Sequence, residues 1–202
     1  VIVVGYSLYA FGKVVYARYR FIRLGEPESM GDWKERVNVA LRQVFGQTKI
    51  LKDPKSGWAH VAIFYGFIIL QFGALEIIVK GFIEGYEWPI GPLHPWFRLS
   101  QEVTVFAIFL AVGYTGYRRF GEKLRRLKRG KKQTSLYWFI FTLMLSVLFT
   151  LTFEKIWLSE AGSVFSPISS LLAGLFAGVG TQIAQWLFYT FWWAHLLILL
   201  AF

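Results

Sequence analysis

The sequence predicts an all-α fold, an integral membrane bundle of about five transmembrane helices with one amphipathic helix beside it. Three observations support this prediction. Hydrophobic residues make up 55% of the 202 residues and charged residues only 17%, whereas about a quarter of a soluble domain is charged. The apolar residues gather in long runs, and several approach the roughly 20 residues that a helix needs to cross a bilayer. The basic residues lie between these runs, as they do in membrane proteins.

Five apolar runs carry the predicted spans. Each run must be helical, because lipid offers no partner to unpaired backbone groups, and none shows the alternation of a transmembrane β-barrel. The expected bounds are 1–16, 58–79, 103–117 with 99–102 leading into it, 136–157, and 179–202. The chain does not start with Met and both of its ends fall inside apolar runs. We therefore expect it to be a fragment of a longer protein.

The basic residues predict the orientation. Nine Lys or Arg lie between Arg18 and Lys55, and nine more lie between Arg118 and Lys132. Both groups fall on the same face of the predicted bundle, which the positive-inside rule makes cytoplasmic. The connections on the opposite face carry only three basic residues: Lys80, Arg98 and Lys155. The net charge of +10 therefore indicates loops beside a membrane and not a nucleic-acid partner.

Three connecting segments also have recognisable patterns. Apolar residues recur at helical spacing among charges over 29–47, which predicts a cytoplasmic amphipathic helix that Gly46 and then Asp53-Pro54 bring to an end. The segment 84–96 holds three prolines and two tryptophans, as expected of an outer interfacial loop. The segment 163–178 is rich in Ser and Gly. It is either a short interfacial helix or the true beginning of the fifth span.

Three histidines are the main candidates for chemistry. The chain has no cysteine, so it can form no disulfide, c-type haem attachment or cysteine-held iron–sulfur cluster. His60 and His195 lie in predicted spans, where ionisable side chains are costly and usually functional. Counted from the span edges they fall at about the same depth, where two imidazoles can hold a b-type haem. Two alternatives stay open: His60 is an ordinary interfacial residue, or the fifth span begins near Gln185 and the pairing fails.

Two residues of the predicted outer side have two interpretations each. His94 is expected in the outer loop, flanked by Leu93 and Pro95. It is either a structural or solvated histidine or part of a haem edge or quinone pocket. Glu76 is either an ion-pair partner of Lys80, four residues away, or a proton acceptor for quinol oxidation. The sequence shows no phosphate loop, zinc-ligand cluster or nucleophile–base pair.

Two groups of motifs carry a family resemblance. One is GQTKIL at 46–51 followed by GWAH at 57–60 and GF at 66–67, and the other is FWWAHLL at 191–197. With five helices and a basic inner side, they resemble the cytochrome b membrane domain of the nitrate reductase gamma-subunit family. The closer likeness is to its form fused to heterodisulfide-reductase-related iron–sulfur proteins. Those proteins are similar to oxidoreductases that link electron-transfer flavoprotein to menaquinone.

The resemblance implies that residues 1–202 form a single domain of the transmembrane haem cytochrome type, in the cell membrane of a prokaryote. His60 and His195 match axial-ligand positions for haem b, with one haem or two in the bundle. The family commonly takes two histidines from each of two helices, but Leu70 stands about ten positions after His60. The further histidine of the last helix would fall beyond Phe202. His60 could pair with that residue, which would leave His195 for another haem or for none.

The resemblance also implies partners and a function. An iron–sulfur domain is expected after residue 202, and iron–sulfur clusters are expected only there. Electrons would pass between cytoplasmic iron–sulfur or flavoprotein centres, electron-transfer flavoprotein among them, and menaquinone or another quinone. Arg18 and Arg20 are expected at the haem propionates, unless they serve only as topology signals. The chain would then be part of a quinone-linked membrane oxidoreductase with the lipid bilayer as its surroundings.

Two other functions remain as alternatives. The first is a cofactor-free membrane anchor or assembly module of a redox complex. The second is a small transporter or channel, against which stand the few charges within the spans and the lack of an evident inverted repeat. Substitution of His60 and His195 separates the haem hypothesis from the anchor hypothesis, because an anchor would assemble without either imidazole.

Overall fold

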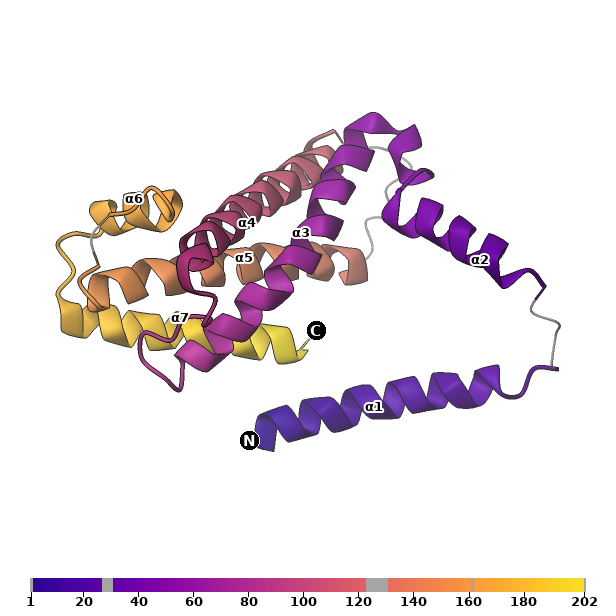
Figure 1. Ribbon diagram of the computed structural model, residues 1–202, viewed down its shortest axis with the longest axis horizontal. Coiled ribbons are helices and arrows are strands. Elements are labelled where there is room, and N and C mark those ends of the chain that lie inside the picture. The colour runs from indigo at the N-terminus through magenta and orange to yellow at the C-terminus, as the bar shows by residue number, and fades with distance from the viewer. Residues whose placement is uncertain (1, 27–30, 123–130, 161, 202) are drawn as a thin grey trace. The chain divides into compact units, whose positions relative to one another are not determined.

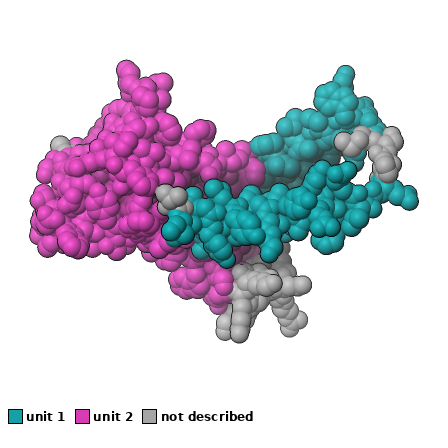
Figure 2. All heavy atoms as spheres, turned by 90° about the horizontal axis from the view of Figure 1, so that it is seen from below, with its two compact units in different colours: residues 1–49, 199–202 teal, residues 50–198 magenta. Residues whose placement is uncertain are grey.

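The computed structural model describes residues 2–26, 31–122, 131–160 and 162–201, with the side chains of 131–133 left out of the description. The regular elements among these residues are all helical, as the sequence predicts, and comprise seven α-helices with short π and 3-10 turns (Figure 1). The chain divides into two compact units (Figure 2). Unit 1 holds residues 1–49 and 199–202, and unit 2 holds residues 50–198.

Unit 1 contains two α-helices with exposed surfaces. Helix α1 spans Ile2–Ile22, which is longer than the predicted run of 1–16. The structure has four helices long and apolar enough to cross a membrane, and α1 is not one of them. The basic residues Lys13, Arg18 and Arg20 interrupt its apolar sequence, which lowers its mean hydropathy. The structure thus supports a helix here, but one less apolar than the four others.

The predicted amphipathic helix is present with a later start than expected. Helix α2 spans Trp33–Ala40 and continues as a π turn over Leu41–Phe45. The Asp32 side chain accepts a 2.9 Å hydrogen bond from the backbone N–H of Lys34 and so caps the first turn. The helix ends at Gly46, as predicted. A side chain at Gly46 would collide with the carbonyl oxygen of Arg42, so the chain can turn away there only with glycine.

Unit 2 contains the four long apolar helices. They are α3 (Pro54–Lys80), α4 (His94–Gly116, extended by a π turn over Tyr117–Gly121), α5 (Lys131–Trp157) and α7 (Thr181–Ala201, of which the part up to Ile198 lies in this unit). These correspond to the second to fifth predicted spans. Helix α3 begins at Pro54, which has no N–H to leave unpaired at a helix start. The predicted break at Asp53-Pro54 is therefore the start of the helix itself.

The Ser- and Gly-rich segment 163–178 contains a further, shorter helix of unit 2. Helix α6 spans Pro167–Leu175 and is separated from α7 by a turn. This is the short-helix alternative, and α7 begins only at Thr181. The buried carboxylate of Glu102, on α4, accepts hydrogen bonds from the backbone N–H groups of Ile168 and Ser169 and from the Ser169 hydroxyl. A negative charge at a helix N-terminus is stabilising, so Glu102 fixes α6 against α4.

Small residues bring α3 and α4 together. A side chain at Gly66 would overlap Ile108, and one at Gly73 would overlap the amide of Gln101. Close packing through glycine is typical of helices in membranes. Ile108 and Val105 have no exposed surface, so the centre of unit 2 lies along this contact.

Aromatic side chains, in contrast, hold α7 at a distance from α5. The ring centroids of Phe149 and Phe191 are 4.8 Å apart, those of Phe153 and Phe191 are 5.7 Å apart, and those of Trp157 and Phe188 are 5.3 Å apart. Large rings therefore fill the space between these helices.

One boundary differs from the prediction in a way that matters for the site. Helix α4 begins at His94, whereas the sequence predicts a span from Val103 with 99–102 leading into it. His94 was expected in an outer loop, as a structural or solvated histidine or as part of a haem edge or quinone pocket, but it is only 5% exposed and opens the helix. The physical reason is that Arg98 and His94 find carboxylate partners here, so these polar residues can continue an apolar helix.

Candidate functional site

His195 belongs to α7 and its side chain points into the interior of unit 2, toward α5. Its side chain is almost fully buried, and its residue is 2% exposed. The Nδ1 atom is 3.0 Å from the hydroxyl oxygen of Ser146, and this hydroxyl donates a 2.7 Å hydrogen bond to the backbone carbonyl oxygen of Leu143. A hydroxyl has one proton, and that of Ser146 goes to Leu143, so the hydroxyl oxygen accepts a proton from Nδ1 of the imidazole. Through Ser146, the α5 backbone therefore orients the ring and selects its tautomer.

The other ring nitrogen of His195 is left without a partner. Its Nε2 atom is buried and makes no hydrogen bond among the described residues. Buried polar atoms nearly always have a hydrogen-bond partner, so the unpaired Nε2 atom of His195 requires an explanation. A histidine that donates from one nitrogen to a fixed hydrogen-bond partner, with a free lone pair on the other nitrogen, has the arrangement of a metal-bound imidazole. His195 therefore fits the role of an axial ligand.

Trp192 sets the depth of His195 along the bundle. Its indole Nε1 donates a 2.7 Å hydrogen bond to the carbonyl oxygen of Ile77, close to the end of α3. Its ring lies against the position that a side chain at Gly81 would occupy. His195 follows Trp192 by one turn. It is therefore level with the last third of α3.

His60 lies at a different depth. It precedes Ile77 on α3 by almost five turns, or about 25 Å of helix. In Figure 1, α3 crosses α7 near its own C-terminal end, and its N-terminal end lies away from α7. The predicted match in depth between His60 and His195 is thus wrong in this structure. It fails because about the first two turns of α7 extend past the end of α3 instead of starting level with it.

His60 occupies an open position on the surface of α3. The residue is exposed and its ring is stacked with that of Phe64 at 6.5 Å. It stands at one end of a shallow apolar groove of about 330 Å³ that follows one face of the helix. The groove is lined by His60, Ile63, Phe64, Phe67, Ile68 and Gln71. A flat apolar group could lie in this groove with the imidazole at its edge.

His94 and Glu76 lie in a cluster of charges where the ends of three helices meet. The Nε2 atom of His94 is 3.3 Å from a carboxylate oxygen of Glu76, and its Nδ1 atom is 3.2 Å from Glu87. Glu76 also lies 3.6 Å from Lys80, so the predicted ion pair exists. Both ring nitrogens of His94 are therefore occupied by carboxylates. His94 can therefore exchange protons or form an ion pair, but neither of its nitrogens is free to bind iron.

The cluster extends across α3, α4 and α5. Lys80 contacts Glu154 at 2.8 Å, and Arg98 contacts Glu87 at 3.2 Å and Glu160 at 3.0 Å. Lys155 is 3.5 Å from Glu160 and donates to the Ser166 hydroxyl at 2.9 Å. We call this set the charged cluster, and its members are Glu76, Lys80, Glu87, His94, Arg98, Glu154, Lys155 and Glu160.

Glu160 lies in the loop after α5, at the edge of the charged cluster. Burial by itself raises the pKa of the Glu160 carboxyl. The nearby guanidinium of Arg98 and the ammonium groups of Lys155 and Lys80 outweigh this effect, so the pKa lies below the ordinary value of 4.5. The carboxylate is therefore held in its charged form.

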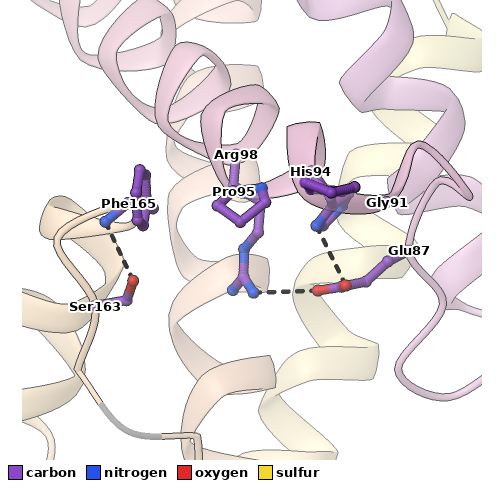
Figure 3. Close-up of a pocket in the computed structure, with 8 residues that line it drawn as sticks. Glu87, Gly91, His94, Pro95, Arg98, Ser163 and Phe165 are labelled. Carbon is purple, nitrogen blue, oxygen red and sulfur yellow. Dashed lines mark hydrogen bonds and ion pairs between the residues drawn. The ribbon is translucent and has the colours of Figure 1, made fainter.

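A pocket opens beside the charged cluster. It has a volume of about 300 Å³ and is lined by Glu87, Gly91, Pro92, His94, Pro95, Arg98, Ser163 and Phe165. Figure 3 shows His94 and Arg98 both directed at the carboxylate of Glu87. The pocket therefore combines apolar walls with donors and an acceptor.

The remaining predicted residues are arginines of the basic segments. Arg18 and Arg20 are exposed on α1, in unit 1, so their role at haem propionates stays a prediction. Among the basic residues of the second predicted inner loop, Arg118 is buried and donates 2.5 Å and 3.3 Å hydrogen bonds to Ser56 and Glu122. Part of that loop, 123–130, lies outside the described residues. The described groups of His, Asp and Glu form no cluster of three that could hold a bare metal ion.

Several residues of the site are not evident from the sequence. Ser146 is one serine in an apolar helix, and only the fold shows that it faces His195. Glu87 and Glu160 resemble ordinary loop carboxylates. One residue in the sequence pointed to these carboxylates. Arg98 is a lone basic residue on a face otherwise poor in positive charge, and such a residue beside a membrane span usually has an acidic partner.

Comparisons with known proteins supply an independent line of evidence. The chain is 45% identical over all of its 202 residues to the probable iron–sulfur-binding oxidoreductase FadF of Bacillus subtilis. It is 24% identical over 169 residues to an EtfAB:quinone oxidoreductase of Syntrophomonas wolfei. No protein-family model and no solved structure matches the chain.

The matches cover only part of each relative. The aligned regions make up 29% of the first protein and 23% of the second, so the chain spans less than a third of the curated relatives it matches. Both relatives are oxidoreductases by name. The chain is therefore homologous, over its full length, to a part of the probable iron–sulfur-binding oxidoreductase FadF.

Proposed function

We propose that this chain is the membrane electron-transfer domain of a quinone-linked oxidoreductase and that it holds b-type haem. The observation that carries the proposal is the orphan Nε2 atom of His195, buried within the bundle of apolar helices. Homology to an iron–sulfur-binding oxidoreductase and to an EtfAB:quinone oxidoreductase supports the redox role. The likeness to the cytochrome b domain of the nitrate reductase gamma-subunit type belongs to the same proposal.

His195 and His60 would serve separate haem positions. A haem at His195 would have the Nε2 atom of this residue as one axial ligand, while Ser146, itself bonded to the backbone of Leu143, keeps the ring in place. A second position would lie at the exposed His60, with the apolar groove of α3 as one wall. Haem in such sites supplies one-electron transfer. The protein contributes ring orientation, burial and the neighbouring charges.

Two observations support the proposed partners: the names of the relatives and the distribution of basic residues along the chain. We propose that the side carrying the basic residues of 18–55 and 118–132 is cytoplasmic and that α1 crosses the membrane as a fifth span. An iron–sulfur domain or subunit, reduced by electron-transfer flavoprotein, would then dock on this side, nearer His60. Menaquinone or another quinone would react on the outer side, nearer His195, Glu76 and His94.

The test is the absorption spectrum of the full-length protein, purified in detergent after haem-replete expression. The proposal expects a Soret band and visible bands that sharpen on reduction, with haem b recovered on extraction. Addition of a short-chain quinol or quinone should change the redox state of the haem. A protein that inserts and assembles normally but is colourless would overturn the haem proposal and favour a cofactor-free anchor.

A further inference from the structure

We propose that Glu76, His94 and Glu87 form a proton relay that connects the membrane interior with the outer solution, with His94 as the proton carrier. The relay goes beyond the proposed electron transfer, and its geometry does not depend on haem. It is built from residues of three segments: α3, the loop that follows it, and the first turn of α4.

The first argument is the placement of the imidazole between two carboxylates. The Nε2 atom lies 3.3 Å from Glu76 and the Nδ1 atom 3.2 Å from Glu87. A neutral imidazole has one N–H, so it can donate to only one of the two carboxylates. The imidazolium donates to both. The geometry therefore lets a proton on His94 move to either side.

The second argument is the difference in exposure along the chain of groups. The side chains of Glu76 and His94 are each 7% exposed, whereas that of Glu87 is 46% exposed. Glu87 also lines the pocket beside the cluster, together with His94 and Arg98 (Figure 3). Water can therefore reach the outer carboxylate but not the inner one. His94 is the bridge between a buried acid and an accessible one.

The transfer conserves protons and charge at every step. The imidazolium passes the Nδ1 proton to the carboxylate of Glu87, which releases it to water in the pocket. This leaves a neutral imidazole with its remaining proton on Nε2, so the ring must turn over to bring its free nitrogen to Glu76. That nitrogen then takes a proton from the carboxylic acid form of Glu76, which becomes a carboxylate. The reverse order carries a proton inward. In each step one acid loses the proton that one base gains.

The surrounding charges favour a mobile proton over a fixed ion pair. From α3, Lys80 contacts Glu76 at 3.6 Å but lies closer, at 2.8 Å, to Glu154 of α5. From α4, Arg98 is shared between Glu87 and Glu160, and Glu160 also faces Lys155 of α5. Each permanent cation is thus divided between two carboxylates or committed to the other end of the cluster. Among the described neighbours, Glu76 therefore has two cationic partners. One is Lys80, which it shares with Glu154, and the other is His94 when it is protonated.

Infrared difference spectroscopy of the full-length protein tests the relay without any haem signal. A pH step across the neutral range, in protein with isotope-labelled histidine, should reveal an imidazolium-to-imidazole change together with carboxylate bands. His94→Gln should abolish this histidine signal. After a rapid pH jump, Glu87→Gln should slow the protonation of His94 by at least about tenfold, because the path then lacks its accessible carboxylate. Glu84→Gln, which alters an exposed carboxylate of the same loop, is the matched control and should leave the rate unchanged.

A lysine at position 94 separates the relay from a purely structural ion pair. His94→Lys keeps a positive charge between the two carboxylates but holds its proton through the neutral range. The relay predicts that this variant keeps the thermal stability of the parent protein and loses the pH-dependent carboxylate bands. If the parent protein shows the same spectrum as His94→Lys, or if Glu87→Gln leaves the protonation rate unchanged, the relay is refuted. Both outcomes are independent of whether the protein binds haem.

Discussion

Trp192 on α7 donates its indole N–H to the carbonyl oxygen of Ile77 on α3, at 2.7 Å. This one hydrogen bond joins residues 115 positions apart and sets how far α7 is shifted along α3. It places His195, one turn later, level with the last third of α3 and far from His60. The separation of the two histidines, and with it the proposal of two haem positions, follows from this contact.

Gly81→Ala should disturb that contact. A Cβ atom at position 81 would overlap the indole of Trp192, so either the ring or the end of α3 must move. Overpacking of this kind costs about 1–3 kcal/mol. We expect a lower melting temperature in detergent and a weaker haem signal from the His195 position. Gly113→Ala is the matched control, because nothing lies within 4 Å of its Cβ position. Equal melting temperatures for the two variants would contradict the packing described.

Ser146→Ala should weaken haem binding at His195 without unfolding the protein. The change removes the hydroxyl 3.0 Å from Nδ1 and leaves the ring less firmly oriented. Loss of such an outer partner typically costs about 10–100-fold in affinity. Titration of haem into the apoprotein measures the effect. Thr142→Ala on the same helix removes an exposed hydroxyl that bonds only its own helix, and it should change nothing. If both variants bind haem equally well, Ser146 has no orienting role.

Removal of Lys80 should destabilise unit 2 strongly. Lys80→Met leaves the buried carboxylate of Glu154 without its 2.8 Å partner, and an uncompensated buried charge costs about 3–5 kcal/mol. Chemical denaturation in micelles gives the free energy of unfolding. The double variant Lys80→Met with Glu154→Leu should recover most of the loss, because it removes both charges. A double variant as unstable as the single one would show that the pair itself is not the cause.

Glu102→Ala should release α6. The carboxylate accepts bonds from the N–H groups of Ile168 and Ser169 and from the Ser169 hydroxyl, and unpaired donors cost about 1–3 kcal/mol. Amide hydrogen exchange should rise over Pro167–Leu175 before it rises elsewhere. Gln182→Ala, an exposed change near the start of α7, provides the comparison. Unchanged exchange in α6 would mean that its other contacts hold it in place.

Stability should fall in acid partly because of Glu160. The pKa of this carboxyl lies below its ordinary value of 4.5 in the folded protein. Its contribution is therefore complete above the ordinary pKa and disappears as the pH falls through the lowered one. Melting temperatures between about pH 7 and pH 3 should drop less steeply for Glu160→Gln than for the parent protein. Parallel curves would show that Glu160 is not stabilised in its charged form.

Much of the fold was predictable because hydrophobicity and charge determine it locally. The four long apolar helices and the amphipathic segment at 33–45 follow from run length and periodicity. The start of α4 was not predictable, because His94 and Arg98 look like loop residues until their carboxylate partners are known. The site was predicted only in part. His60, His195 and Glu76 were singled out by their place in apolar helices, but their mutual depth depends on how α7 is shifted along α3, which Trp192 decides.

Haem content and reduced-minus-oxidised spectra of His60→Ala and His195→Ala, in the full-length protein, test the central claim most directly. Two separate positions predict that each variant loses its own share of the haem and its own component of the visible bands. The double variant should then lose the sum. If either single variant loses everything that the double variant loses, the two histidines share one haem. If neither variant loses any haem, these histidines are not ligands and the account fails.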